Sequence, residues 1–364
     1  MAPLVVVLLG GALVLLAGCG SAGYLSQSVR GHLDVMRAAR PVEAWLADAA
    51  TPAELRERLE LSQRMRDFAV AELALPDNAS YRRYAELGRP AVVWNVVAAP
   101  ELSLTLRTWC FPVVGCVGYR GYFARADAEA LAAELRAGGE EVSVYGVPAY
   151  STLGRLPGDF FADPLLSTFI RWPEGELARL IFHELAHQVA YAADDTEFNE
   201  SYATAVERLG GARWLAEHAS PAAREAHERL EARRRDFRAL AGATRARLAA
   251  IYQGPGSADD KRRAKAEALA AMRAEHARLK AGPWGGHAGY DAWFANANNA
   301  SLGVQAAYNA LVPAFEALYE HEGRDFGRFH AAVRRLAALP KAERHATLAA
   351  ALPPSPAAAP SLPH

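Results

Sequence analysis

The chain has few cysteines, almost no net charge and no apolar run long enough to cross a bilayer. Only 3 of its 364 residues are cysteine, and 40 Lys and Arg residues face 41 Asp and Glu residues, which leaves a formal net charge of −1. Balanced charge gives no general attraction to nucleic acid, so we expect no nucleic-acid partner. With 51% hydrophobic and 22% charged residues, the composition is that of a globular protein with a sizeable core.

The apolar run at the N-terminus covers residues 4–17, and its last residues, Leu16 and Ala17, are followed by Gly18 and Cys19. Its length is that of the hydrophobic region of a signal peptide rather than of a membrane-spanning helix. Small residues followed by cysteine resemble a bacterial lipobox, in which the cysteine is lipidated. We therefore predict a signal peptide over residues 1–18, a lipid on Cys19, a flexible tether over residues 19–27 and a place at the bacterial envelope, facing the periplasm. A chance cysteine after an apolar segment is the alternative.

The other two cysteines, Cys110 and Cys116, are separated by five residues that include a Gly and a Pro. In an exported protein this spacing could close a small disulfide loop, and two free thiols are the alternative. The spacing is too wide for the cysteine pairs that usually bind structural zinc.

Periodicity and capping signals predict an α+β fold that is predominantly helical. A β-rich stretch predicts a small mixed sheet, and Gly210 and Gly211 are expected to end the second of two helices that follow it. The predicted segments are helices over 28–90, the sheet over 91–154, two helices over 174–210, a long helical hairpin over 220–280, a helical part over 288–350 and a disordered tail over 353–364.

The residues from His183 to His187 read His-Glu-Leu-Ala-His. On an α-helix, positions i and i+4 lie almost above one another, so both imidazoles can bind one ion. Glu184 projects about 100° around the helix from His183, where it can act on a water molecule as general base without binding the metal. A chance match is expected in about a few chains in a hundred. We therefore predict a single Zn²⁺, two histidine ligands and a catalytic glutamate.

A catalytic zinc needs a third protein ligand. Ala193 stands where metzincins have a third histidine, whereas residues 199–203, Asn-Glu-Ser-Tyr-Ala, resemble the Asn-Glu-x-x-Ala segment of gluzincins. This resemblance implies that Glu200 is the third ligand. Glu207 lies seven residues further on the same helix face, so it is a candidate hydrogen-bond partner for a ligand histidine, with a plain surface role as the alternative.

Segments in order along the chain, from the first helices to about residue 320, resemble a bacterial family of zinc-dependent lipoproteins that carry the name aminopeptidase. Besides the metal-binding helix, they cover residues 75–81, 93–101, 109–112, 119–123, 149–154 and 298–300, with Tyr308. The resemblance implies a gluzincin-like metallopeptidase that hydrolyses peptides.

The resemblance also implies roles for residues outside the metal site. Gluzincins pair the substrate backbone with an edge strand before the metal-binding helix, which suggests that Tyr150, Ser151 and Thr152 line the cleft, although an ordinary core strand is equally compatible. It also implies that Asn298 and Asn299 contact substrate.

An oxyanion donor is needed besides the metal. Tyr202, Tyr308 and His287 are the candidates. The resemblance favours Tyr308, and core packing is the better interpretation of Tyr202.

Aminopeptidases usually need an acid that holds the free amine. Glu101, Asp163 and Asp291 are candidates, and the pattern singles out none of them. An envelope endopeptidase therefore stays an alternative within the enzyme class. A non-catalytic, zinc-stabilised lipoprotein scaffold is the alternative outside it, and Glu184 argues against that alternative, because metal binding alone does not require this acid.

Overall fold

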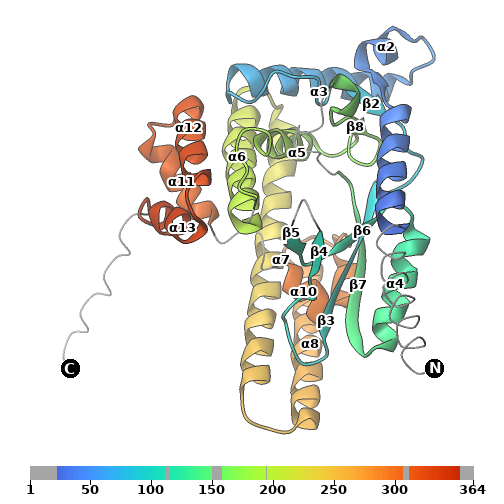
Figure 1. Ribbon diagram of the computed structural model, residues 1–364, viewed down its shortest axis with the longest axis vertical. Coiled ribbons are helices and arrows are strands. Elements are labelled where there is room, and N and C mark those ends of the chain that lie inside the picture. Colours follow the sequence, from blue (N-terminus) through green and yellow to red (C-terminus); the bar gives the residue numbers. More distant parts are fainter. Residues whose placement is uncertain (1–22, 112–114, 150–157, 194, 306–310, 353–364) are drawn as a thin grey trace, which may run out of the picture.

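The computed structural model describes residues 23–111, 115–149, 158–193, 195–305 and 311–352 (Figure 1). It is predominantly helical with small sheets, as expected for the α+β class. Helices α3, α5 and α6 form the centre of the largest hydrophobic core, together with residues of α11 and α12. His183 and Glu184 lie on α5 and His187 directly follows it, so this core supports the candidate site.

The N-terminal part contains a helix over 23–38 and a small mixed sheet. Strand β2 pairs antiparallel with β1 on one side and parallel with β8 on the other. The predicted tether over 19–27 is wrong for its last five residues, which are helical. Tertiary contacts order them, because Gln27 hydrogen-bonds to the backbone of Gly121 and Phe123. The elements of this part are β1 Arg40–Pro41, α2 Val42–Ala47, α3 Ala53–Ala71, β2 Arg83–Ala85, the 3-10 turn η1 Asp159–Phe161 and β8 Leu165–Leu166.

The second sheet has the order β6-β3-β7, and both of its pairs are antiparallel. The prediction of a mixed sheet over 91–154 is therefore wrong. Helix α4 does connect two strands that run in the same direction, β6 and β7, but β3 is inserted between them and runs the opposite way. The elements are β3 Val93–Pro100, β6 Arg120–Tyr122, α4 Arg125–Ala137 and β7 Glu140–Val147. A separate hairpin of β4 Trp109–Phe111 and β5 Gly115–Val117 carries a disulfide between Cys110 and Cys116.

Helices α5 Glu174–Ala186 and α6 Thr196–Glu217 pack side by side. The expectation that Gly210 and Gly211 end α6 is wrong, since the helix continues for six residues beyond them. Their role is close packing: a Cβ atom on Gly210 would lie 2.6 Å from Leu73, and one on Gly211 would lie 2.6 Å from Arg179. These glycines allow α6 to approach α5 and the segment that follows α3.

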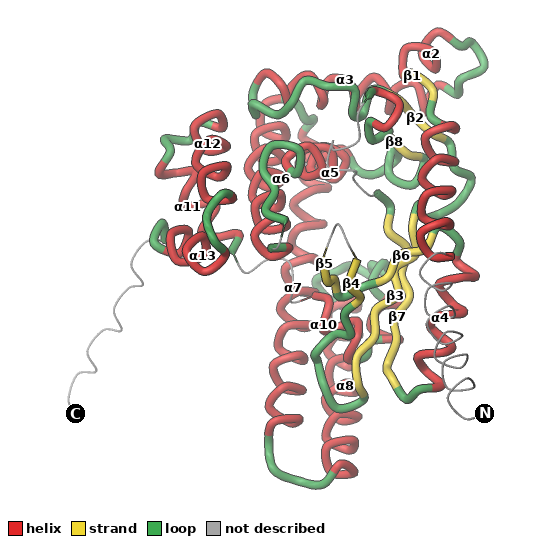
Figure 2. The backbone as a smooth tube through the Cα atoms, in the orientation of Figure 1, coloured by secondary structure: helices red, strands yellow, loops and turns green. Residues whose placement is uncertain are grey.

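A long helical hairpin follows, formed by α7 Pro221–Gln253 and α8 Ala258–Ala281. It extends beyond the rest of the molecule, as the backbone trace shows (Figure 2). Helices α11, α12 and α13 group beside α6, on the side away from the sheets (Figure 1). Within the described ranges, no helix combines the length and hydropathy needed to cross a membrane. The C-terminal elements are α9 Asp291–Asn296, α10 Asn299–Gln305, α11 Val312–His321, α12 Phe326–Ala337 and α13 Lys341–Ala349.

Candidate metal centre

His183 and His187 lie one helical turn apart near the C-terminal end of α5. Their Nε2 atoms are 3.2 Å apart, and the two rings are nearly perpendicular, with an interplanar angle of 85°. Leu177, Ile181 and Leu185 on the opposite side are fully buried and hold the helix in the core. Two imidazole lone pairs this close repel each other unless a proton or a cation lies between them.

Glu200 on α6 completes a group of three. Its carboxylate oxygens lie 3.4 Å from Nε2 of His183 and 3.8 Å from Nε2 of His187. Ligand atoms bound to a tetrahedral zinc at about 2.0–2.1 Å lie about 3.3 Å apart, so this spacing fits one ion. Among the residues that the structure describes, no second group of three potential ligands comes this close.

The turn between α5 and α6 is fixed by side chains that bind its backbone. The amide of Asn199 bonds with both N and O of Ala192, each at 2.7 Å. Asp195 caps α6 by accepting from the N–H of Phe198, and Arg344 of α13 binds the second oxygen of that carboxylate at 2.8 Å. The short turn therefore fixes the position of Glu200 along α6 relative to the two histidines.

Glu207 contacts the His183 ring at Nδ1, through one oxygen of its carboxylate. Its Oε2 is 2.9 Å from Nδ1 of His183, and its Oε1 accepts from Arg179 at 2.5 Å. Arg179 also donates to Glu231 of α7 at 2.6 Å, so the network joins three helices. A carboxylate at Nδ1 favours the tautomer that carries its proton there, which leaves the lone pair of Nε2 for a metal.

Burial and the neighbouring charges shift the pKa values of these groups. Burial disfavours a charged His183, but its hydrogen bonds with Glu200 and Glu207 outweigh this and raise its pKa well above the usual value. Burial and the charge of His183 lower the pKa of His187 to about 4. Burial opposes ionisation of Glu207 too, yet His183 and Arg179 lower its pKa to about 2. In this chain two negative carboxylates thus face the histidine pair, which is a favourable environment for a cation.

Glu184 stands beside the three potential ligands without belonging to them. Burial, followed by the charges of Glu200 and Asp163, raises its pKa to about 7, against the lowering effect of His183. A carboxylate with a pKa near neutrality can accept a proton and release it again. A cavity of about 290 Å³ borders the site and is lined by His183, Glu200 and Glu207.

Comparison with known families identifies one family. A model of the family described as "Putative aminopeptidase" matches residues 23–348. The chain belongs to this family. Membership indicates peptidase activity. No curated protein and no solved structure matches the chain.

Four of the predicted site residues cannot be placed. Tyr150, Ser151 and Thr152, predicted to line the cleft, and Tyr308, the favoured oxyanion donor, lie outside the described residues. Asn298 and Asn299 are described, and their side chains hold α10 against the ends of β3 and β7. Asn298 donates to the carbonyl of Val142, whereas Asn299 is fully buried and donates to the carbonyl groups of Pro100 and Glu101. Their proposed contact with substrate stays a prediction.

The other two candidates for an oxyanion donor pack elsewhere. The hydroxyl of Tyr202 lies in the core, 2.8 Å from Nδ1 of His330. His287 packs against Tyr290 near the base of the hairpin, with ring centroids 5.9 Å apart. Core packing is the role that the sequence favours for Tyr202.

Of the three candidate acids for the substrate amine, two form ion pairs with residues of α8. Glu101 is partly buried and binds Arg262 at 2.9 Å, and Asp291 pairs with Lys280 and His276. Asp163 is 2% exposed, and its charge acts on Glu184.

Sequence reasoning overlooks three residues around the centre. Arg179 binds Glu207. In the sequence nothing distinguishes it from an exposed charged residue of α5. Burial and the charge of Glu200 raise the pKa of Tyr119 to about 12. Tyr81 is 1% exposed, and the charge of Glu184 acts on it. Both tyrosines fall in segments that resemble the family, which was the available signal.

Proposed function

We propose that the chain is a zinc-dependent peptidase of the gluzincin type, and specifically an aminopeptidase, in which His183, His187 and Glu200 hold one Zn²⁺. The observation that carries this proposal is the spacing of 3.2 to 3.8 Å between the three ligand groups, on two helices whose turn is fixed by hydrogen bonds. Membership of the family supports peptide hydrolysis.

The bound metal would supply Lewis-acid activation of a water molecule and of the scissile carbonyl. Glu184 accepts the proton of the attacking water and then delivers it to the leaving amine. Glu207 holds His183 in one tautomer and one orientation, and Arg179 holds Glu207. Helix α5 carries the catalytic carboxylate. His183 is oriented by Glu207 and Arg179, whose contacts with Glu231 extend across α5, α6 and α7.

Hydrolysis of a panel of peptide substrates, measured before and after the metal is removed and restored, tests this function. The full chain, purified in detergent, is assayed on aminoacyl arylamides and on internally quenched peptides with blocked N-termini. We expect hydrolysis that a chelator abolishes and one equivalent of Zn²⁺ restores. Cleavage of blocked peptides alone would favour the endopeptidase alternative. Zinc binding without cleavage of any substrate would favour the scaffold alternative.

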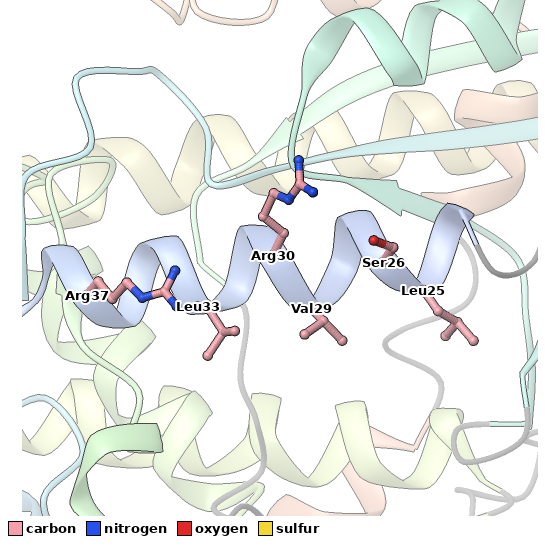
Figure 3. A pocket seen from close by; sticks show the side chains of 6 residues that line it. All are labelled: Leu25, Ser26, Val29, Arg30, Leu33 and Arg37. Carbon is pink, nitrogen blue, oxygen red and sulfur yellow. The ribbon is translucent and has the colours of Figure 1, made fainter.

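We also propose that a lipid on Cys19 holds the chain at the envelope. The N-terminal helix supports this with an exposed apolar side (Figure 3), where Leu25, Val29 and Leu33 project together and Arg30 projects the opposite way. Leu25 is 52% and Val29 is 59% exposed, and these are two of the four large apolar side chains that are exposed in the described residues. Leu25 follows Cys19 by six residues, a span of at most about 20 Å, so the anchor would bring this side to the lipid headgroups.

Replacement of the cysteine tests the anchor. Cys19→Ala should move the protein from the membrane fraction to the soluble fraction and should abolish labelling by a fatty-acid analogue. Labelling that persists in the variant would contradict the anchor and would leave the peptidase proposal untouched.

A further inference from the structure

The cavity beside the metal centre is enclosed by three helices that contact one another, α5, α6 and α7 (Figure 1). Its wall on α5 extends from His183 back to Glu176, seven residues or about 10 Å along the helix. Helix α7 adds Arg234 and Arg238, which lie one turn apart on the same face. At about 290 Å³, the cavity is near the lower end of the sizes of small-molecule pockets, so it can hold a group as large as a side chain.

One part of the lining is apolar. Trp172 and Leu180 are partly buried and pack against the largest hydrophobic core, and Thr204 on α6 adds a short side chain. Apolar walls of this kind suit the methylene groups of a substrate side chain, because the transfer of such groups from water is favourable. The cavity therefore combines a surface for an aliphatic stem with charged groups for its end.

The acids in the lining are each matched by a cation. Arg234 binds Glu176, and Arg179 binds Glu207 at 2.5 Å. Glu200 is a potential ligand of the proposed metal ion. A positively charged ligand would have to compete with these cations for their acids, whereas a negatively charged ligand would not. The lining thus disfavours a further positive group.

Arg238 differs from the other arginines of the cavity because no carboxylate lies close to it. Within the described part of the chain, its one ion pair is with Glu231 at 3.7 Å, which is too far for a hydrogen bond. Glu231 already accepts from Arg179 at 2.6 Å and from Arg234. The side chain of Arg238 is 33% exposed, compared with 8% for Arg179. Burial and the positive charge of Arg208 lower the pKa of Arg238, which is consistent with an excess of positive charge at this point.

A guanidinium group with donors to spare is a good partner for a carboxylate. Its planar N–H groups can donate two parallel, charge-assisted hydrogen bonds to the two carboxylate oxygens. We propose that Arg238 binds a carboxylate of the substrate in this cavity, so that the enzyme prefers peptides with a negative charge on a residue next to the scissile bond. The assignment rests on the peptidase function proposed above and deepens it, because it names the class of substrate.

The size of the cavity fits an acidic residue. In an extended glutamate residue, the side-chain carboxyl carbon lies about 5 Å from the backbone carbonyl carbon. A sphere of about 290 Å³ is about 8 Å across. A glutamate whose carbonyl lies beside His183 and Glu200, the two potential metal ligands in the lining, can therefore place its carboxylate at Arg238.

Two carboxylates of a short peptide can occupy this position. One is the side chain of an aspartate or glutamate residue on either side of the scissile bond. The other is the C-terminal carboxylate of a dipeptide, which belongs to the residue directly after that bond. Both offer the same chemistry to Arg238, and matched substrates distinguish them.

The first test compares substrates that differ in one carboxylate. The full chain in detergent, loaded with zinc, is assayed on glutamyl and glutaminyl arylamides, on the amides of Ala-Glu and Ala-Gln, and on Ala-Ala with a free or an amidated C-terminus. We expect kcat/KM to be about tenfold to a hundredfold higher for the charged member of at least one pair, mainly through KM. The pair that shows the difference identifies the source of the carboxylate.

Variants of Arg238 link this preference to the cavity. Arg238→Gln should bring the charged and neutral substrates to within about twofold of each other and should leave the neutral ones unchanged. Arg238→Lys should keep part of the preference, because it retains the charge and loses the paired hydrogen bonds. Arg235→Gln changes an exposed arginine of the same helix and should behave as the parent chain does. A preference that survives in Arg238→Gln would overturn the assignment.

A binding measurement separates this subsite from the peptidase function. Calorimetry on the zinc-loaded chain should show that N-acetyl-Glu-amide binds about tenfold more tightly than N-acetyl-Gln-amide, and Arg238→Gln should remove the difference. Zinc is present in both chains, so its own affinity for carboxylates does not contribute to that change. Binding that depends on Arg238 in a chain that cleaves nothing would support the subsite and refute the peptidase function. Equal binding and equal cleavage of charged and neutral substrates would support the peptidase and overturn the subsite.

Discussion

Nδ1 of His183 lies 2.9 Å from a carboxylate oxygen of Glu207, a residue 24 positions further along the chain. This contact joins α5 and α6. Through it, Glu207 on α6 orients the ring of His183 on α5. Glu207 in turn is held by Arg179, which also reaches α7 through Glu231. The geometry of the three potential ligands, His183, His187 and Glu200, therefore depends on the packing of three helices rather than on the five-residue motif alone.

Glu207→Gln should weaken zinc binding by about tenfold to a hundredfold, because the amide is neutral and no longer favours the Nε2 lone pair of His183. Competition with a fluorescent chelator measures the change. Glu217→Gln, an exposed glutamate at the end of the same helix, is the matched control and should bind zinc as the parent chain does. Equal affinities in the two variants would show that the Glu207 contact does not support the ligand.

Gly211→Ala should destabilise the fold although it replaces a glycine inside a helix. Such a change usually stabilises a protein by about 1 kcal/mol. Here the new Cβ would lie 2.6 Å from Cγ of Arg179, whose far end is held by Glu207 and Glu231. Gly242→Ala in α7 is the control, since no atom lies within 4 Å of its new Cβ, and it should raise stability. Urea unfolding of both variants measures the two effects, and a stabilised Gly211→Ala variant would contradict the packing argument.

Acid should destabilise the protein through Glu176 on α5. Burial raises the pKa of this carboxyl group, but His227 and Arg234 lower it more, to about 2, compared with 4.5 for an ordinary glutamate. The folded state therefore binds fewer protons than the unfolded state between these values. The stability that the group contributes is present above about pH 4.5 and is lost as the pH falls toward about 2.

Unfolding free energies between pH 7 and pH 3 check this expectation. Glu176→Gln should be less stable at pH 7 and should lose less stability on acidification than the parent chain. Glu225→Gln, an exposed position on α7, should follow the parent curve. Parallel curves for the parent and Glu176→Gln would exclude the carboxylate as a source of acid sensitivity.

The helix that positions His183 and His187 can be predicted from the sequence alone, because the four-residue spacing of the two histidines matches the period of an α-helix. Glu200 follows from resemblance to a known segment, and its position against the histidines depends on hydrogen bonds from Asn199 and Asp195 that no periodicity reports. The two glycines of α6 look like a helix end, since their close contacts are with residues distant in sequence. The backbone hydrogen bond between Asp163 and Tyr81 lies beside a pair of strands only two or three residues long, which is too short for an alternating pattern.

The most direct test of the proposed function is the activity of Glu184→Gln with its zinc content measured. The glutamine keeps the shape of the side chain and cannot take the proton of the attacking water. We expect the variant to bind one equivalent of zinc, as the parent chain does, and to lose about a thousandfold in kcat on the best substrate of the panel. A zinc-loaded variant that keeps its activity within about tenfold of the parent would contradict the role of Glu184 as general base.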